Sequence, residues 1–235
     1  MDLKTAKVLV TGGSSGIGLA TAKYLVAAGA RVAICGRRAP AVEAAARESG
    51  AVPIVADVSR EDDVERLVAT VVRELGGYDT LINNAGFGRF APLLETTADD
   101  FRSVWETNVL GAMLAARESA RHFVAQRHGN IVNVASTSGQ RGGANGSAYA
   151  SSKFALAGLT QVWRAELRRY NVRVMQINPS EVLTEFRRNS GRQAPGENPS
   201  KLHAEDIADV IADMLALSDR TLVKDVTVWA TNPSD

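Results

Sequence analysis

The chain has 235 residues, 45% of them apolar and 23% charged, and its 27 Lys and Arg against 26 Asp and Glu give a net charge of +1. This balance excludes a disordered chain, a collagen-like chain and a strongly basic nucleic-acid binder, so no nucleic-acid partner is expected. Because α/β domains commonly reach about 200 to 250 residues, we predict a single domain over residues 1–235.

Short β-branched runs alternate with longer segments of helical period, which is the pattern of βαβ units. The seven predicted strands are Lys7 to Thr11, Arg31 to Cys35, Val52 to Ala56, Thr80 to Asn83, Asn130 to Ala135, Val172 to Ile177 and Val226 to Trp229. The predicted helices are Ile17 to Ala28, Pro40 to Ser49, Glu61 to Leu75, Asp99 to Gln126, Ser147 to Tyr170 and Glu205 to Leu217. Several strands are apolar on successive residues, so helices should cover both faces of a doubly wound parallel sheet.

Two further features bear on location and chemistry. The single cysteine, Cys35, lies in an apolar strand and is predicted to be a core side chain. The N-terminal residues show no signal-peptide pattern, and no apolar stretch approaches the roughly 18 residues of a membrane span. We therefore expect a cytoplasmic protein without a membrane partner.

Residues 185–203 form the least regular stretch, rich in Arg, Gly, Pro and Asn. An insertion of this length in an α/β domain is more often a binding loop than a connector, so it is the predicted substrate loop. Arg187, Arg188 and Arg192 in this stretch would meet a phosphate or an acidic carrier protein, or would form a solvated charge run, which we favour.

A glycine-rich turn, Thr11 to Gly18, follows the first strand and opens onto a helix. Glycines at 12, 16 and 18 would let the backbone approach a pyrophosphate at the positive helix N-terminus. The spacing departs from G-x-G-x-x-G, and a structural turn is the alternative. Its place in a βαβ unit favours a Rossmann-like dinucleotide-binding fold.

The second strand ends in Gly36-Arg37-Arg38, and no Asp or Glu occurs between Leu19 and Val42. An NAD site usually places an acid at this point to bind the ribose 2′-hydroxyl, whereas a guanidinium suits a 2′-phosphate. The predicted cofactor is therefore NADP(H). The alternative, a solvated arginine pair, predicts equal use of NAD and NADP.

Ser136 ends the fifth strand, and Tyr149 and Lys153 lie four residues apart at the start of the next helix. That spacing places both side chains on one helical face. A neighbouring ammonium favours the phenolate form of a tyrosine, so the pair can act as a general acid/base. Ser136 can donate a hydrogen bond to a carbonyl oxygen on which negative charge develops.

With these motifs in order, the chain resembles the short-chain dehydrogenase/reductase family over essentially its whole length. Thr11 to Gly18 is similar to the family's T-G-x-x-x-G-x-G, and Asn83 to Gly86 to its N-N-A-G. Asn108 resembles its helix asparagine, and Ser136, Tyr149 and Lys153 its remaining active-site residues. The arginine after the second strand resembles that of the NADP-preferring branch.

The resemblance implies roles for these residues. Tyr149 would donate or accept the proton, Lys153 would lower its pKa and hold the nicotinamide ribose, Ser136 would steady the substrate oxygen, and Asn108 would support a water linking Lys153 to solvent. The implied cofactor-binding residues are Gly12, Ser14, Ser15, Gly16, Ile17, Gly18, Arg37, Arg38, Asp57, Val58, Asn84, Ala85, Gly86, Tyr149, Lys153, Pro179, Val182 and Thr184.

One motif departs from the family. Where N-P-G-x-V-x-T is common, this chain has Asn178 to Thr184 with Ser180 in place of glycine. Ser180 would have either a φ below zero or a strained left-handed conformation. Glu181 would face solvent, which we favour, or line the substrate mouth and disfavour acidic substrates.

The remaining candidates are weaker. The three histidines have no metal-like spacing, and no metal is predicted. Phe87, Arg89 and Phe90 would line a pocket or pack as a loop, and Arg141 and Asn145 are candidates for the pocket wall.

The sequence thus predicts an NADP(H)-dependent oxidoreductase that interconverts a carbonyl and a secondary alcohol. A small ketone, a 3-hydroxy acid and a 3-oxoacyl thioester are the candidate substrates. The alternative is a non-catalytic NADP(H)-binding regulator. The helices expected at Asp99 to Gln126 and Ser147 to Tyr170 resemble those that pair subunits in the family, so a homodimer or homotetramer is expected.

Overall fold

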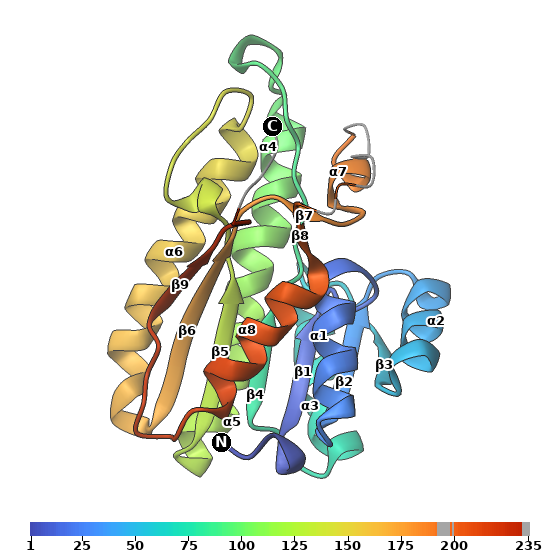
Figure 1. Ribbon diagram of the computed structural model, residues 1–235, viewed down its shortest axis with the longest axis vertical. Coiled ribbons are helices and arrows are strands. Elements are labelled where there is room, and N and C mark those ends of the chain that lie inside the picture. The colour runs from blue at the N-terminus through green and yellow to red at the C-terminus, as the bar shows by residue number, and fades with distance from the viewer. Residues whose placement is uncertain (192–197, 199, 232–235) are drawn as a thin grey trace.

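A seven-stranded parallel sheet forms the centre of the computed structural model, which describes residues 1–191, 198 and 200–231. Its strand order is β3-β2-β1-β4-β5-β6-β9, so the chain runs outward from β1 in both directions, as a doubly wound sheet requires (Figure 1). The seven strands are β1 Lys7–Thr11, β2 Arg31–Gly36, β3 Val52–Val55, β4 Thr80–Asn83, β5 Gly129–Val134, β6 Val172–Pro179 and β9 Asp225–Val228. The predicted fold class and all seven predicted strands are confirmed.

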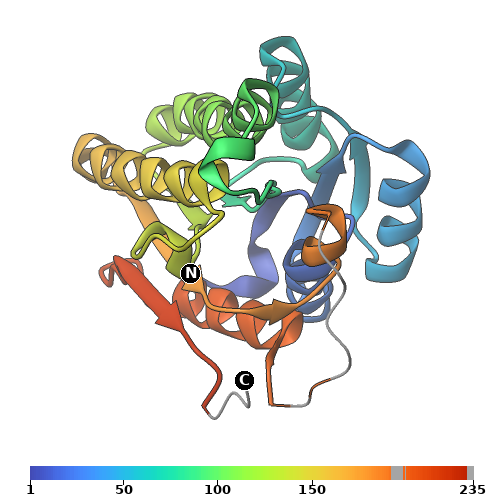
Figure 2. The same ribbon diagram turned by 90° about the horizontal axis from the view of Figure 1, so that it is seen from above.

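Helices cover both faces of the sheet, as the continuous apolar strands predicted (Figure 2). One core packs Val8, Val10 and Ile34 against α1, α2 and α8, and the other packs Leu9, Ala33 and Ile131 against α3 and α5. The helices are α1 Gly16–Ala27, α2 Ala39–Ser49, α3 Glu61–Leu75, α4 Ala98–Trp105, α5 Ala112–Gln126, α6 Ser147–Leu167, α7 Phe186–Asn189 and α8 Ala204–Ala216. None in the described part of the chain is long and apolar enough to cross a membrane.

The helix predicted over Asp99 to Gln126 differs in its centre. Helices α4 and α5 are joined by a π-helical turn over Glu106–Gly111, and Asn108 lies in that turn. A π-turn adds a residue to the helical repeat and is frequent at functional sites. The hydrophobic pattern predicted a continuous helix correctly but carried no signal for this local widening.

Two short strands and a helix after β6 were not predicted. Strands β7 (Val182–Leu183) and β8 (Leu202–His203) pair in parallel, Val182 with Leu202 and Leu183 with His203. This pairing brings together the two ends of the predicted substrate loop, and α7 lies within it. Arg192 and the other residues of 192–197 and 199 lie outside the described residues.

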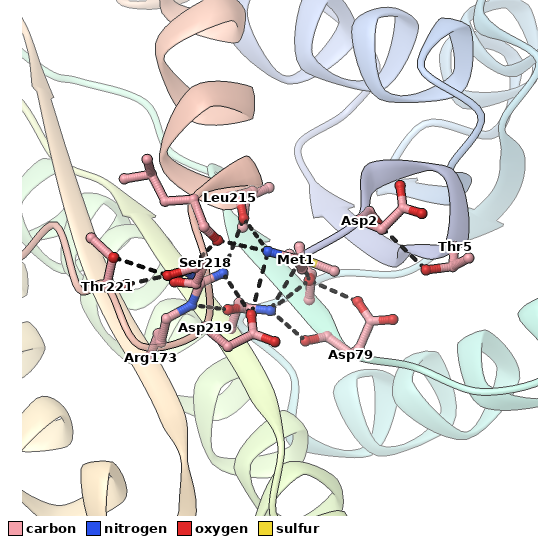
Figure 3. A network of polar contacts seen from close by, with 12 residues as sticks. Met1, Asp2, Thr5, Asp79, Arg173, Leu215, Ser218, Asp219 and Thr221 are labelled. Carbon is pink, nitrogen blue, oxygen red and sulfur yellow. Dashed lines mark hydrogen bonds and ion pairs between the residues drawn. The ribbon is translucent and has the colours of Figure 1, made fainter.

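A network of polar contacts lies at the amino-terminal ends of the strands (Figure 3). Arg173 at the start of β6 is 6% exposed and donates to the carbonyl oxygens of Leu215 and Thr221 and to Asn130 Oδ1 at 2.7–3.2 Å. The amino group of Met1 donates to the carbonyls of Leu215 and Leu217 at 2.9 and 2.7 Å. The last carbonyl groups of a helix have no hydrogen-bond donor within it, so these cations supply donors to the carbonyl groups at the end of α8.

Candidate active site

A cleft of about 1040 Å³ runs along the carboxyl-terminal ends of the strands, where open α/β sheets bind ligands. The turns after β1, β2, β3, β4, β5 and β6 all contribute to its lining. Of the predicted catalytic and cofactor-binding residues, all line this cleft except Gly18 and Asn108. The structure therefore brings together residues that are up to about 170 positions apart in the chain.

The glycine-rich turn is close-packed in the manner expected of a dinucleotide site. Gly12 has a φ of +64°, and a Cβ there would lie 2.8 Å from the Cα of Ala85. Gly18 does not line the cleft, because it packs the helix on the turn: a Cβ there would lie 2.5 Å from the Gly12 carbonyl oxygen. The first residues of α1 face the cleft, and Ser15 makes no side-chain cap there, so these amides suit a pyrophosphate.

Asn84 holds this turn against the strand beside it. Its Nδ2 donates to the carbonyls of Thr11 and Gly12 at 2.9 and 3.2 Å. Thr11 Oγ1 in turn accepts from the backbone amides of Asn84 and Ala85, each at 3.0 Å. Thr11 belongs to the motif that the sequence showed but was not predicted as a site residue. Its buried hydroxyl positions two residues of the cleft.

Arg37 and Arg38 follow β2 at one end of the cleft and are exposed. Neither guanidinium makes an ion pair with another residue of the described chain. Beneath them Cys35 is fully buried, and burial raises the pKa of its thiol to about 12, as befits the predicted core side chain. Asp57 is held by Ser59, whose amide and hydroxyl donate to Asp57 Oδ1 at 3.0 and 2.8 Å.

Ser136, Tyr149 and Lys153 meet at the other end of the cleft, which we call the substrate end. Ser136 leaves β5 at 8% exposure, and its hydroxyl lies near enough to the Tyr149 side chain to lower the pKa of the phenol. Lys153 Nζ lies 5.8 Å from the centroid of the Tyr149 ring and donates to the carbonyl of Val134 at 2.9 Å. The spacing of four residues on α6 thus places both tips at one site, as predicted.

Burial controls the ionisation of this pair in the protein. Burial raises the pKa of Tyr149 to about 12, and the Ser136 hydroxyl offsets part of that rise. Burial also lowers the pKa of Lys153 to about 8. From the sequence, the Lys153 ammonium is predicted to lower the pKa of Tyr149. In the structure, desolvation of the phenol has the larger effect and raises this pKa. At neutral pH the tyrosine is therefore a proton donor and the lysine a cation.

Asn108 does not line the cleft but supports its wall from the π-turn. Its side chain accepts from the Phe87 amide at 3.0 Å and donates to the Phe87 carbonyl at 2.9 Å. Its Nδ2 also donates to Ser152 Oγ at 3.0 Å, and that hydroxyl donates to the Tyr149 carbonyl at 2.7 Å. Asn108 and Ser152 thus connect the segment after β4 to the first turn of α6. Ser152 was not predicted, because a serine on a helix carries no distinctive signal.

The departure at Ser180 causes no left-handed strain. Ser180 is not among the described residues with a positive φ, so the first alternative, a φ below zero, is correct. Glu181 lines the cleft and pairs with Lys201 at 2.9 Å, its side chain 40% exposed. It therefore lies at the mouth of the cleft while remaining partly in solvent, which combines the two predicted alternatives.

Some predicted pocket residues are confirmed and others are not. Phe87, Arg89 and Phe90 line the cleft. Arg141 and Asn145 do not line it, because the segment between Ser136 and α6 turns away, and the Asn145 carbonyl accepts instead from Ala91 at 3.0 Å. Among the described residues no three His, Cys, Asp or Glu side chains gather as a metal ion would need.

Comparison with known proteins agrees with this architecture and site. Residues 6–195 match the family model described as short chain dehydrogenase. The chain belongs to the short-chain dehydrogenase/reductase family, whose members are oxidoreductases that use a nicotinamide cofactor.

Three curated relatives illustrate the range of this similarity. Levodione reductase of Leifsonia aquatica is 36% identical over 85% of this chain and 78% of its own length. The NADP-dependent 3-hydroxy acid dehydrogenase of Schizosaccharomyces pombe is 32% identical over 99% of this chain and 94% of its own. The match to the oxidoreductase YxnA of Bacillus subtilis covers only 54% of that protein.

Solved structures agree at the level of the fold. A crystal structure of levodione reductase superposes with a TM-score of 0.87 at 32% identity, covering 96% of this chain and 97% of that one. A structure of NAD+-bound xylitol dehydrogenase superposes with a TM-score of 0.84 at 32% identity, covering 97% and 98%. The relatives thus include proteins named for either nicotinamide dinucleotide.

Proposed function

We propose that the protein is an NADP(H)-dependent oxidoreductase that interconverts a carbonyl and a secondary alcohol, with Tyr149 as general acid/base. One observation carries this proposal. The same cleft holds Arg37 and Arg38, which make no ion pair within the described residues, at one end and the Ser136, Tyr149 and Lys153 cluster at the other. The two groups follow β2 and β5, which stand three strand positions apart, roughly 14 Å.

The cleft fits a dinucleotide in its shape and charge. The glycine turn and the α1 N-terminus would receive the pyrophosphate, and Asp57 and Val58 would border the adenine. Pro179, Val182 and Thr184 would contact the nicotinamide end. The preference for NADP(H) is supported by these two guanidinium groups, since a 2′-phosphate would give them the anionic partner that they lack among the described residues.

The bound cofactor supplies or accepts the hydride at the substrate carbon. In reduction, Tyr149 transfers its hydroxyl proton to the carbonyl oxygen, while Ser136 donates a hydrogen bond to the same oxygen. Hydride and proton together convert C=O into CH–OH, and NADPH becomes NADP+. The Lys153 cation stabilises the phenolate that remains until solvent returns a proton, and Asn108 would support a water on that route.

The test is an NADPH-oxidation screen over ketones, β-keto esters and acyl thioesters with the parent protein and Tyr149→Phe. We expect turnover by the parent and a loss of about a thousandfold in kcat for the variant, since general acid–base catalysis contributes about 10²- to 10⁴-fold. NADPH binding should remain, because the phenyl ring keeps its packing. A parent without activity on every carbonyl would favour the alternative, an NADP(H)-binding regulator.

We also propose a homodimer or homotetramer in the cytoplasm. Helices α4 and α6 and the π-turn expose large apolar side chains, among them Phe101, Leu110, Phe154 and Val162 at 38–51% exposure. Such side chains support an interface along these helices. Size-exclusion chromatography with light scattering tests it, and a monomer at micromolar concentration would contradict it.

A further inference from the structure

Three aromatic rings gather at the substrate end of the cleft. The ring centroids of Phe90 and Phe186 lie 5.4 and 5.2 Å from that of Tyr149. The two phenylalanine rings are 6.5 Å apart and meet edge to face. All three residues line the cleft. Phe90 and Phe186, which we call the aromatic wall, therefore present apolar carbon beside the hydroxyl proposed to transfer the proton.

The backbone around the aromatic wall is fitted to these two rings. Phe90 follows β4, and Phe186 begins α7 far along the chain. Gly88 lies between them: a Cβ there would lie 2.5 Å from the Phe90 ring and 3.2 Å from the Phe186 ring. The Gly88 amide donates to the buried hydroxyl of Ser190 at 3.3 Å, which joins the two segments. The wall is thus a packed part of the fold.

Three charged lining residues at this end are paired with other charged side chains, and the remaining cation there, Lys153, is 5% exposed. Three ion pairs involve lining residues: Arg89 with Asp100 at 3.4 Å, Glu181 with Lys201 at 2.9 Å, and Glu185 with Arg188 at 3.1 Å. Each pair is neutral, so a substrate carboxylate or phosphate would have to displace a protein acid to gain an exposed cation among the described residues. The opposite end differs, since Arg37 and Arg38 lack such partners in the described chain.

We infer that the substrate is an uncharged ketone, or the matching alcohol, whose carbonyl carbon carries a ring or similarly bulky apolar group that packs on Phe90 and Phe186. This inference rests on the proposed function and narrows its substrate class. It ranks the neutral ketone above the 3-hydroxy acid, whose carboxylate would find no exposed, unpaired cation among the described residues of the substrate end. It also ranks a cyclic group above a straight chain of equal size, because a rigid ring covers the wall with less loss of conformational freedom.

The first measurement compares kcat/KM for cyclohexyl methyl ketone and the straight-chain methyl ketone of the same carbon count. We expect the ring ketone to be favoured by about tenfold, within the range that apolar pocket contacts supply. Phe90→Ala and Phe186→Ala should each bring that ratio close to unity, mainly through KM. Tyr24→Ala, which removes an exposed aromatic ring from α1, is the matched control and should leave the ratio unchanged.

The second measurement tests charge with methyl acetylbenzoate and the free acetylbenzoate, which share the ring and the ketone. We expect the ester to be favoured by about tenfold or more, since the carboxylate loses solvation without meeting an exposed, unpaired cation among the described residues. Equal rates for ring and straight chain, or a preference for the carboxylate, would overturn the inference while leaving the proposed function standing.

A binding measurement distinguishes a failure of this inference from a failure of the proposed function. Tyr149→Phe retains the wall, so calorimetric titration of this variant, saturated with NADP+, should give tighter binding of the cyclohexyl ketone than of the straight-chain ketone by about tenfold. Ring-selective binding without turnover in the parent would contradict the proposed function and support the wall. Turnover in the parent without ring selectivity in either assay would contradict the wall alone.

Discussion

Buried cations lie at both ends of the parallel strands, but they differ in how many hydrogen-bond acceptors surround them. At the amino-terminal ends, Arg173 is surrounded by oxygens: its guanidinium donates to the Asn130 side chain and to the carbonyls that end α8. At the carboxyl-terminal ends, Lys153 is equally buried but has one acceptor in the described chain, the carbonyl of Val134. An ammonium has three donors, so this lysine retains unmet hydrogen-bonding capacity. Saturated cations hold the fold together, whereas the unsaturated one remains available for a ligand.

Arg173→Met should have the largest effect of the substitutions considered. Removing the guanidinium leaves several buried carbonyls without a donor, so we expect a loss of about 3–5 kcal/mol in the free energy of unfolding. Turnover per folded molecule should not change, because the residue lies at the ends of the strands away from the cleft. Urea denaturation measures the loss, with exposed Arg47→Met as the control. A stable Arg173→Met protein would show that the network is dispensable.

The pH dependence of Lys153 gives the next largest effect. Its pKa is lowered from 10.5 to about 8 in the folded protein, so the unfolded chain binds more protons between these values and stability rises with pH there. Relative to Lys153→Met, the wild type should gain about 3 kcal/mol from pH 8 to pH 10.5.

Urea midpoints of both proteins across this range measure the gain. Tyr149 titrates at higher pH and is present in both proteins, so its contribution cancels in the difference. A pH-independent difference would mean that the ammonium is solvated in the folded state.

Lys153→Met should also lower kcat by about a hundredfold, since the phenolate loses its neighbouring cation. The loss should appear without unfolding at neutral pH, where removing a buried ammonium relieves a desolvation cost. Circular dichroism and steady-state kinetics on the same sample test this contrast with Arg173→Met. Unchanged kcat would remove Lys153 from the proposed mechanism.

Arg37→Ala removes a guanidinium that makes no ion pair within the described residues, at the end of the cleft opposite Tyr149. We expect kcat/KM for NADPH to fall by about tenfold, and that for NADH to change little, because only the former brings a phosphate to this position. Arg47→Ala provides an exposed arginine control on the next helix. A wild type that prefers NADH would contradict the NADP(H) assignment directly.

Glu181→Gln should have the smallest effect. Removing the carboxylate frees the Lys201 ammonium at the cleft mouth, and the remaining cation is partly screened by solvent. Turnover of acetylbenzoate relative to its methyl ester should therefore improve by only about threefold. An unchanged ratio would show that Glu181 acts as a surface residue.

The sequence by itself determined the sheet, its covering helices and the positions of most site residues. Strands such as Val8 to Val10 and Val32 to Cys35 carry runs of apolar residues that only a sheet covered on both faces can bury. Tyr149 and Lys153 were placed together by helical periodicity alone, and the glycine turn by its position between strand and helix. These features depend on neighbours in the chain, so local pattern suffices to predict them.

The tertiary structure decided the features that depend on contacts between distant segments. The π-turn at Asn108, the pairing of β7 with β8, and the packing of Phe90 on Phe186 each join residues with no shared local pattern. The raised pKa of Tyr149 is of the same kind, because desolvation depends on everything that surrounds the ring. The sequence identified the groups proposed to react, and the fold sets their ionisation and the side chains that surround them.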